Sequence, residues 1–154
     1  MKSKVLFQES QKFHQWWIWI ILIGLVIVAA STFDYLEPLK NQLTVDKVIL
    51  TITAIGILVL FLTLRLNTRI TEEKIEIRFF PFVRKDFYWK DMTSAQLIDY
   101  GFVGGWGIRI WTSYGTVYNV KGSQGLHLKI AGKQYVIGTQ KQEELRSSIA
   151  HLLK

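Results

Sequence analysis

The sequence predicts a membrane α-helical hairpin followed by a mainly β domain of the α+β class. Three patterns in the 154-residue chain predict this combination. Two long segments, Gln15 to Phe33 and Val48 to Leu64, contain no charged residue, although charged residues make up 20% of the chain. After Arg65, apolar and polar residues alternate with a period of two, which is typical of strands with one buried face. The last segment, after Thr139, returns to helical spacing.

The first apolar segment, residues 16–33, has the length and composition of a membrane-spanning helix. Such a helix extends roughly 27 Å, close to the ~30 Å thickness of a hydrocarbon core. Indole rings favour the lipid headgroup region, and three tryptophans lie at its start: Trp16, Trp17 and Trp19. A cleaved signal peptide is the alternative, because the basic MKSK start precedes the apolar segment and small residues occupy positions 29–31.

The second apolar segment, residues 48–64, predicts a second helix of roughly 26 Å. Lys and Arg concentrate outside the two segments, as Lys2, Lys4, Lys12, Arg65, Arg69, Lys74 and Arg78, against Lys40 and Lys47 between them. Because positive residues favour the cytoplasmic side, we expect a multi-pass protein of the cell (inner) membrane with both termini in the cytoplasm. Residues 34–47 are expected to form a short polar turn outside the cytoplasm. The predicted division is a tail and hairpin, residues 1–66, and a cytoplasmic domain, residues 67–154.

Seven short strands, separated by glycine-containing turns, are predicted in residues 67–154. They cover Ile75–Phe79, Phe87–Trp89, Ala95–Tyr100, Trp106–Trp111, Thr116–Val120, Leu126–Ile130 and Gln134–Ile137. Strands at this spacing predict an antiparallel barrel or sandwich. His127 and Lys129 alternate with apolar residues and are expected to face solvent.

The final segment predicts an amphipathic helix. Thr139 is expected to serve as its N-cap, and Glu143 and Glu144 would lie in its early turns, near the positive end of the helix dipole. Its apolar face consists of Leu145, Ile149, Leu152 and Leu153. This face needs a cover, and the open end of a small β barrel is the nearest candidate.

Several short motifs occur together in the C-terminal part of the chain. They are GWGIR at 105–109, Tyr118-Asn119-Val120, Gly125-Leu126, and Ile137-Gly138-Thr139-Gln140 ahead of Glu143-Glu144-Leu145. With these motifs the chain resembles the bacterial pleckstrin-homology-like (PH-like) domain family of small membrane proteins, in which a two-helix transmembrane hairpin precedes the domain. The resemblance implies a seven-stranded antiparallel barrel or sandwich capped by a C-terminal helix. Gln142 stands where the family often has proline, which affects only a helix-start preference.

The sequence predicts no enzyme, no cofactor and no metal site. The absence of cysteine excludes disulfides, thiolate zinc sites and thiol nucleophiles. His14, His127 and His151 lie in different segments, without a ligand partner at helical or hairpin spacing. No hydrolase or nucleotide-binding motif occurs, and the glycines at 104, 105 and 107 lack the fingerprint spacing. The net charge of +7 is dispersed along the chain, so nucleic acid is not an expected partner.

The expected function is that of a binding or scaffolding module at the cytoplasmic face of the membrane, acting mainly through protein contacts. Aromatic and arginine side chains dominate interface hot spots, and the candidate contact residues are Trp106, Arg109, Trp111 and Tyr114. Trp106 is also compatible with a place in the barrel core. Expected partners are membrane lipids, another membrane or membrane-associated protein, and a second copy of the chain.

Contact with anionic lipid is the alternative function. The candidate residues for it are Arg65, Arg69, Arg84, Lys85 and Lys90, which are also compatible with an ordinary solvated surface. A subunit of an oligomeric channel or transporter is the third hypothesis. It is less favoured because neither apolar segment contains an ionisable residue.

Overall fold

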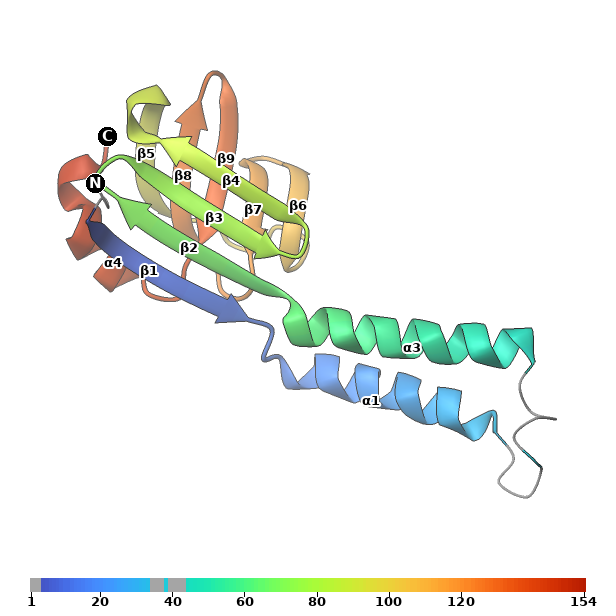
Figure 1. The fold of residues 1–154 in the computed structure, drawn as a ribbon. Coiled ribbons are helices and arrows are strands. Elements are labelled where there is room, and N and C mark those ends of the chain that lie inside the picture. The colour runs from blue at the N-terminus through green and yellow to red at the C-terminus, as the bar shows by residue number, and fades with distance from the viewer. Residues whose placement is uncertain (1–3, 34–37, 39–43) are drawn as a thin grey trace. The chain divides into compact units, whose positions relative to one another are not determined.

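The computed structural model describes residues 4–33, 38 and 44–154, which divide into two compact units (Figure 1). The helical unit is His14–Leu64. The β unit combines the described residues up to Phe13 with Arg65–Lys154. The architecture is mixed α/β, with two sheets and a C-terminal helix.

The described chain begins with β1 (Val5–Lys12) and continues through α1 (Trp16–Ser31) and α3 (Val45–Thr63). The strands that follow are β2 (Arg65–Thr71), β3 (Lys74–Phe80), β4 (Val83–Tyr88), β5 (Met92–Asp99), β6 (Gly107–Thr112), β7 (Gly115–Asn119), β8 (Gln124–Ile130) and β9 (Lys133–Gly138). A 3-10 turn, Trp89–Asp91, joins β4 to β5, and helix α4 (Gln142–Ile149) is followed by a second 3-10 turn, Ala150–Leu152.

The first sheet has the order β1-β2-β3-β4, and all neighbouring strands in it are antiparallel. β1 and β2 are separated along the chain by the helical unit, yet they pair through to Lys12 opposite Arg65. The predicted tail is therefore a strand, and the predicted boundary between residues 66 and 67 falls inside β2. This corrects the division that the sequence predicts, because long-range strand pairing leaves no local signal at either segment.

The second sheet has the order β5-β8-β9-β7-β6. β7 and β9 are parallel, whereas the other neighbours in this sheet are antiparallel. Each of the seven predicted strands overlaps a strand between β3 and β9, so their existence is confirmed. The prediction of an entirely antiparallel arrangement is wrong at β7 and β9, and β1 and β2 are additional to the predicted set.

The main core lies between the two sheets. The rings of Phe87 on β4 and Tyr135 on β9 have centroids 4.9 Å apart. This contact identifies the face of each sheet that packs against the other sheet. Large side chains in this unit that are almost fully buried include Leu66, Ile70, Ile75, Ile77, Phe79, Tyr118, Leu126 and Leu128, together with Leu145 and Ile149 of α4. The alternation that predicts the strands therefore corresponds to burial against a second sheet.

A second, smaller core covers the opposite face of the second sheet. Its buried members are Tyr100, Val117 and Val136, with Ile98, Val103 and Tyr114 packed against them. Gly125 and Gly138 pair across β8 and β9, and a Cβ on Gly138 would lie 3.1 Å from the Tyr100 hydroxyl oxygen. The Tyr100 hydroxyl donates to the carbonyl oxygen of Gly122 at 3.3 Å. Both faces of this sheet are therefore covered.

Polar side chains of β1 bond to the segment that joins β9 to α4. The Glu9 carboxylate is buried and accepts hydrogen bonds from the Thr139 hydroxyl at 2.7 Å and from the Gln140 N–H at 3.0 Å. Gln11, also buried, donates to the Gly138 carbonyl at 2.8 Å. The prediction that Thr139 caps the C-terminal helix is wrong, because α4 begins at Gln142 and the Thr139 side chain binds β1 instead.

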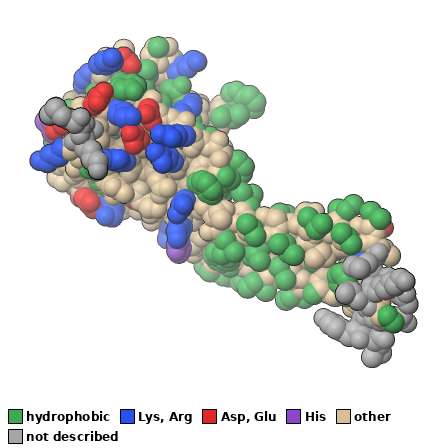
Figure 2. Space-filling model, viewed as in Figure 1, with side chains coloured by type: hydrophobic (Ala, Val, Ile, Leu, Met, Phe, Trp, Pro, Cys, Tyr) green, Lys and Arg blue, Asp and Glu red, His purple; other side chains and the backbone are tan. Residues whose placement is uncertain are grey.

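The helical unit exposes apolar side chains. Ala29 on α1 and Ala54 on α3 are buried, whereas nothing lies within 4 Å of a Cβ built on Gly24 or Gly56. The large apolar side chains that remain exposed include Trp16, Trp17, Ile20, Ile21, Ile23, Ile27 and Val28 on α1, and Ile49, Ile52, Ile55, Val59 and Leu62 on α3. Figure 2 shows hydrophobic side chains spread over this unit.

The two helices differ in length. α3 has 19 residues with a mean hydropathy of 2.3, and among the described residues it is the helix long and apolar enough to cross a membrane. α1 is apolar but has 16 residues, fewer than the predicted span because regular helix ends at Ser31. Most of the predicted polar turn, residues 34–37 and 39–43, lies outside the described residues.

Candidate functional site

The β6–β7 hairpin carries the most exposed aromatic side chain of the described residues. Trp111 is 94% exposed, and its φ of 62° lies in the left-handed region that residues other than glycine rarely adopt. The register between β6 and β7 breaks after Arg109, which pairs with Val117, and resumes at Thr112, which pairs with Gly115. Ile110 and Trp111 therefore form a bulge, and the backbone at this bulge holds the indole in solvent.

The turn beyond the bulge is held by Thr112. Its hydroxyl donates to the Gly115 carbonyl at 2.8 Å and accepts from the Tyr114 N–H at 3.1 Å. A Cβ on Gly115 would collide with the backbone carbonyl of Gln134 on β9, so only glycine permits this close approach. The hairpin is thus fixed against β9.

A depression lies beside Trp111 on the second sheet. Side chains from β6, β7 and β9 line it, including Ile110, Thr116, Lys133 and Tyr135. β6 is the edge strand of this sheet. We call Ile110, Trp111, Thr116, Lys133 and Tyr135 the hairpin surface.

The other three predicted contact residues support the hairpin from within. A Cβ on Gly105 would collide with the Arg109 guanidinium, which occupies the space beside that glycine. The ring of Tyr114 lies edge-on to His127 with centroids 5.9 Å apart and packs on the smaller core. Trp106 is half-buried. Of the four predicted residues, Trp111 alone is well exposed, although all four belong to or flank one hairpin.

His127 does not face solvent as the sequence predicts. It is 9% exposed, and its Nε2 lies 2.9 Å from the side-chain oxygen of Gln134. The predicted alternation along this strand is correct, since the His127 side chain points away from the main core. The expectation fails because Tyr114 and the smaller core cover this second face.

The outer face of the first sheet collects three of the five predicted lipid-contact residues. The side chains of Arg65, Arg69 and Arg84 are exposed. Their neighbours along β2 and β4 are buried or point toward the second sheet, so the three arginines lie on the outer face. Lys85 points the other way, with its Nζ 4.9 Å from the ring centroid of Tyr135 on the second sheet. Lys90 lies beyond β4, with its Nζ 5.7 Å from the Tyr88 ring centroid. The five residues therefore do not form one cluster.

Charge is distributed unevenly along this outer face. Toward the β2–β3 turn, the Lys74 ammonium lies 2.8 Å from Glu76 and 2.7 Å from Asp86. Hydrogen bonds to Asp86 and Glu76 raise the pKa of Lys74. Toward the β3–β4 turn, Arg78 on β3 lies directly opposite Arg84 on β4 in the strand register. Neither arginine forms a salt bridge with a carboxylate among residues 4–33, 38 and 44–154.

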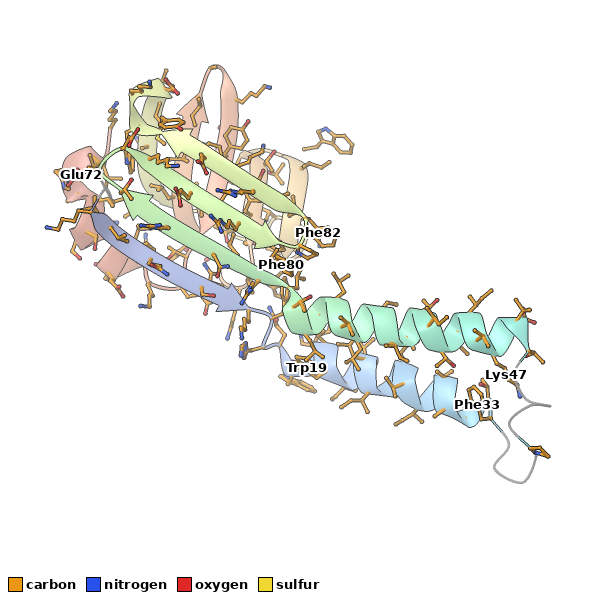
Figure 3. All side chains as sticks on the ribbon, in the orientation of Figure 1. Trp19, Phe33, Lys47, Glu72, Phe80 and Phe82 are labelled. Atoms are coloured by element: carbon orange, nitrogen blue, oxygen red, sulfur yellow. The ribbon has the colours of Figure 1, made fainter. Side chains whose placement is uncertain are left out.

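Two exposed phenylalanines complete the cationic end of this face. Phe80 is 46% exposed and Phe82 is 61% exposed, and both project at the β3–β4 turn (Figure 3). The Arg65 guanidinium carbon lies 5.6 Å from the Phe80 ring centroid. The sequence does not predict Arg78, Phe80 and Phe82 as site residues. Only the strand register shows that they lie at the same end of the sheet as Arg65 and Arg84.

The described side chains show no metal centre. Within the ranges that the structure covers, no group of three or more His, Asp or Glu side chains could hold a metal ion.

Comparison with protein-family models gives no match, and a search of curated proteins finds no significant relative.

Proposed function

We propose that this chain is a membrane-anchored binding or scaffolding module, with a PH-like β unit at the cytoplasmic face that acts mainly through protein contacts. The helical unit is the anchor in this proposal. The hairpin surface is the contact site. The single observation that carries the contact role is the 94% exposure of Trp111 on a left-handed backbone at a bulge.

The exterior of the helical unit supports membrane insertion. Large aliphatic and aromatic side chains are exposed on both helices, and a helix that faces water on one side carries a polar stripe there. Aromatic and cationic groups occupy the ends of the unit: Trp16, Trp17 and Trp19 begin α1, and the Lys47 ammonium lies 5.7 Å from the Phe33 ring centroid (Figure 3). These residue types favour membrane interfaces.

The pairing of β1 with β2 supports a hairpin that returns to its starting side. Lys12 ends β1 before α1, and Arg65 begins β2 directly after α3. Because these two residues pair, both ends of the helical unit lie on one side of any bilayer that α3 crosses, which favours a second crossing in the segment of α1. Lys12, Arg65 and Arg69 then lie on one side, which the positive-inside preference makes the cytoplasm.

The element order supports the PH-like assignment. Strands β3 to β9 correspond to the seven strands that the resemblance implies, and α4 follows them. Motifs that carry the resemblance, GWGIR at 105–109 and Tyr118-Asn119-Val120, lie in or beside β6 and β7. The parallel pairing of β7 with β9 and the additional strands β1 and β2 depart from the implied pattern.

The free-energy cost of exposing Trp111 supports the proposal of protein contact at the hairpin surface. A left-handed conformation costs an L-residue about 1–2 kcal/mol. Because the indole is exposed, burial of its apolar surface within the chain offsets little of this cost. Tryptophan is among the side chains most enriched in binding hot spots, which lie in pockets that exclude water. A partner that covers Trp111 and the adjacent depression would account for both features. Tethering in the membrane raises the effective concentration of such a partner.

Photo-crosslinking in living cells tests the contact role. A photoreactive residue replaces Ile110, which is exposed beside Trp111, so that the indole is retained. We expect a discrete protein adduct that disappears when Trp111→Gly is added. The matched control is Phe102→Ser, which removes another strongly exposed aromatic and should leave the adduct intact. An adduct that survives Trp111→Gly, or labelling of lipid alone, would overturn the contact role.

A further inference from the structure

We propose that the β3–β4 end of the first sheet is a second membrane contact, in which Phe80 and Phe82 enter the bilayer interface while Arg65, Arg78 and Arg84 bind the phosphates of anionic phospholipid. We call these five residues the arginine-phenylalanine edge. The inference rests on the proposed membrane anchor. It adds a lipid-binding surface on the β unit and names its residues.

The strand register places this edge next to the attachment point of the anchor. β2 begins at Arg65, immediately after Leu64, the C-terminal cap of α3. Arg65 pairs with Phe80 on β3 and with Lys12 on β1. Neighbouring strands lie about 4.8 Å apart, so Phe80 is one strand spacing from Arg65, the residue that follows the C-terminal cap of α3.

The outward side chains of β3 change character toward that end. Lys74, Glu76 and Arg78 are polar and are followed by Phe80 on the same face. Phe82 follows in the turn, and both rings remain exposed. Exposed phenylalanines at the far end of a sheet would face water. At the anchored end they can enter the headgroup and acyl boundary, as apolar residues of interfacial segments do.

Among the residues that the structure describes, Arg78 and Arg84 form no salt bridge, in contrast to the neighbouring Lys74. Lys74 binds two carboxylates, whereas Arg78 and Arg84 oppose each other across β3 and β4. Directly opposed like charges destabilise a strand pair. A phosphate between two guanidinium groups would remove this repulsion and form charge-assisted hydrogen bonds in a geometry that arginine favours. The ligand is therefore anionic, and the location beside the anchor selects a lipid headgroup.

Fluorescent labelling of the full chain in vesicles tests the inference. The natural sequence contains no cysteine, so single-cysteine variants accept an environment-sensitive dye at one chosen position. Phe82→Cys reports the edge, Glu73→Cys reports the opposite end of the same sheet, and Ile52→Cys reports the anchor. The vesicles contain either phosphatidylcholine alone or equal amounts of phosphatidylcholine and phosphatidylglycerol, each with a spin-labelled quencher lipid.

We expect quenching at position 82 and none at position 73, with stronger quenching in the anionic vesicles. Each basic residue near an anionic surface contributes about 1 kcal/mol, so the loss of two in Arg78→Glu with Arg84→Glu should reduce the ratio of inserted to free edge at position 82 by roughly thirtyfold. Arg69→Glu is the matched control. It reverses an arginine on the same face that pairs with Glu76, away from the edge, and should have little effect.

The label in the anchor separates the two proposals. Quenching at position 52 without quenching at position 82 would overturn the lipid contact and leave the anchor intact. Absence of quenching at position 52 would overturn the anchor, and the lipid contact with it. Quenching at position 82 that is insensitive to both lipid charge and arginine reversal would overturn the role of the arginines as phosphate ligands.

Discussion

At the scale of single residues, the backbone conformation of Trp111 gives a stability prediction that is independent of any partner. Glycine adopts a φ of 62° without strain, and its added freedom in the unfolded chain costs about 0.5–1 kcal/mol. We therefore expect Trp111→Gly to leave the free energy of unfolding within about 1 kcal/mol of the parent or to raise it. Trp111→Val should lower it, because a β-branched residue tolerates this conformation poorly. Chemical denaturation of the detergent-solubilised chain measures both, and the reverse ranking would contradict the assigned backbone.

Tyr100 gives a pH-dependent prediction. Burial raises the pKa of its hydroxyl, because the phenolate would lose its hydration in the smaller core. The folded state then holds the proton more tightly than the unfolded state does. The stabilisation is complete below the unfolded pKa, near about 10, and declines as pH rises through the folded pKa. Denaturation at a series of pH values should show a steeper alkaline loss of stability for the parent than for Tyr100→Phe. Equal slopes would contradict the buried position of this hydroxyl.

The candidate site was predictable from the sequence only where the residue type itself carried the signal. The sequence identifies Trp111 and its hairpin neighbours as aromatic and arginine residues of hot-spot type. It does not predict their different exposures, because the bulge depends on the register of β6 with β7. Arg84 and Lys85 are consecutive in sequence but point to opposite faces of β4, which grouping by proximity along the chain overlooks. Phe80 and Phe82 flank Pro81, and only strand pairing places them beside Arg65.

At the scale of elements, the predicted strands are those with clear apolar alternation. β3 and β8 contribute alternating apolar residues to the main core, and the sequence identifies both. Apolar alternation does not identify β1, because two of its inward-facing residues, Glu9 and Gln11, are polar. Their side chains form hydrogen bonds with residues near the other end of the chain. The parallel pairing of β7 with β9 also depends on contacts that no local pattern contains.

Glu9 therefore gives the element-scale prediction. Its carboxylate accepts two hydrogen bonds from the segment between β9 and α4, and hydrogen bonds to charged groups contribute about 1.5–3 kcal/mol each. Glu9→Ala removes both acceptors and should destabilise the β unit by on the order of 3 kcal/mol. Gln8→Ala, at the exposed neighbouring position, should change stability by less than about 0.5 kcal/mol. Thermal or urea denaturation compares the two. Equal effects would show that β1 is not held through Glu9.

At the scale of the whole molecule, the helical unit is an insertion between two paired strands. Strand pairing and a small set of polar contacts thus connect the N-terminal segment to β2 and to the segment before the C-terminal helix. The helical unit separates β1 from the rest of the β unit in sequence, although β1 contributes buried residues to that unit. We therefore expect that a short turn can replace the helical unit if the strand pairing is retained.

This exchange is the last prediction. Because Lys12 pairs with Arg65, a chain that keeps Phe13 and Leu64 and joins them by Asn-Gly closes β1 and β2 with a two-residue turn of the type that fits antiparallel hairpins. Phe13 is retained because it is buried and its ring lies 6.4 Å from that of Phe79. We expect this chain to be soluble without detergent and to unfold cooperatively, as measured by circular dichroism during urea titration. A matched chain that starts at Leu64 also lacks the apolar helices but loses Phe7 and Glu9 of β1, both buried, and should fail to unfold cooperatively. If both chains fold equally well, β1 is dispensable; if neither does, the β unit depends on the helical unit. Folding of the first chain alone would show that the β unit requires β1 but does not require the helical unit inserted between β1 and β2.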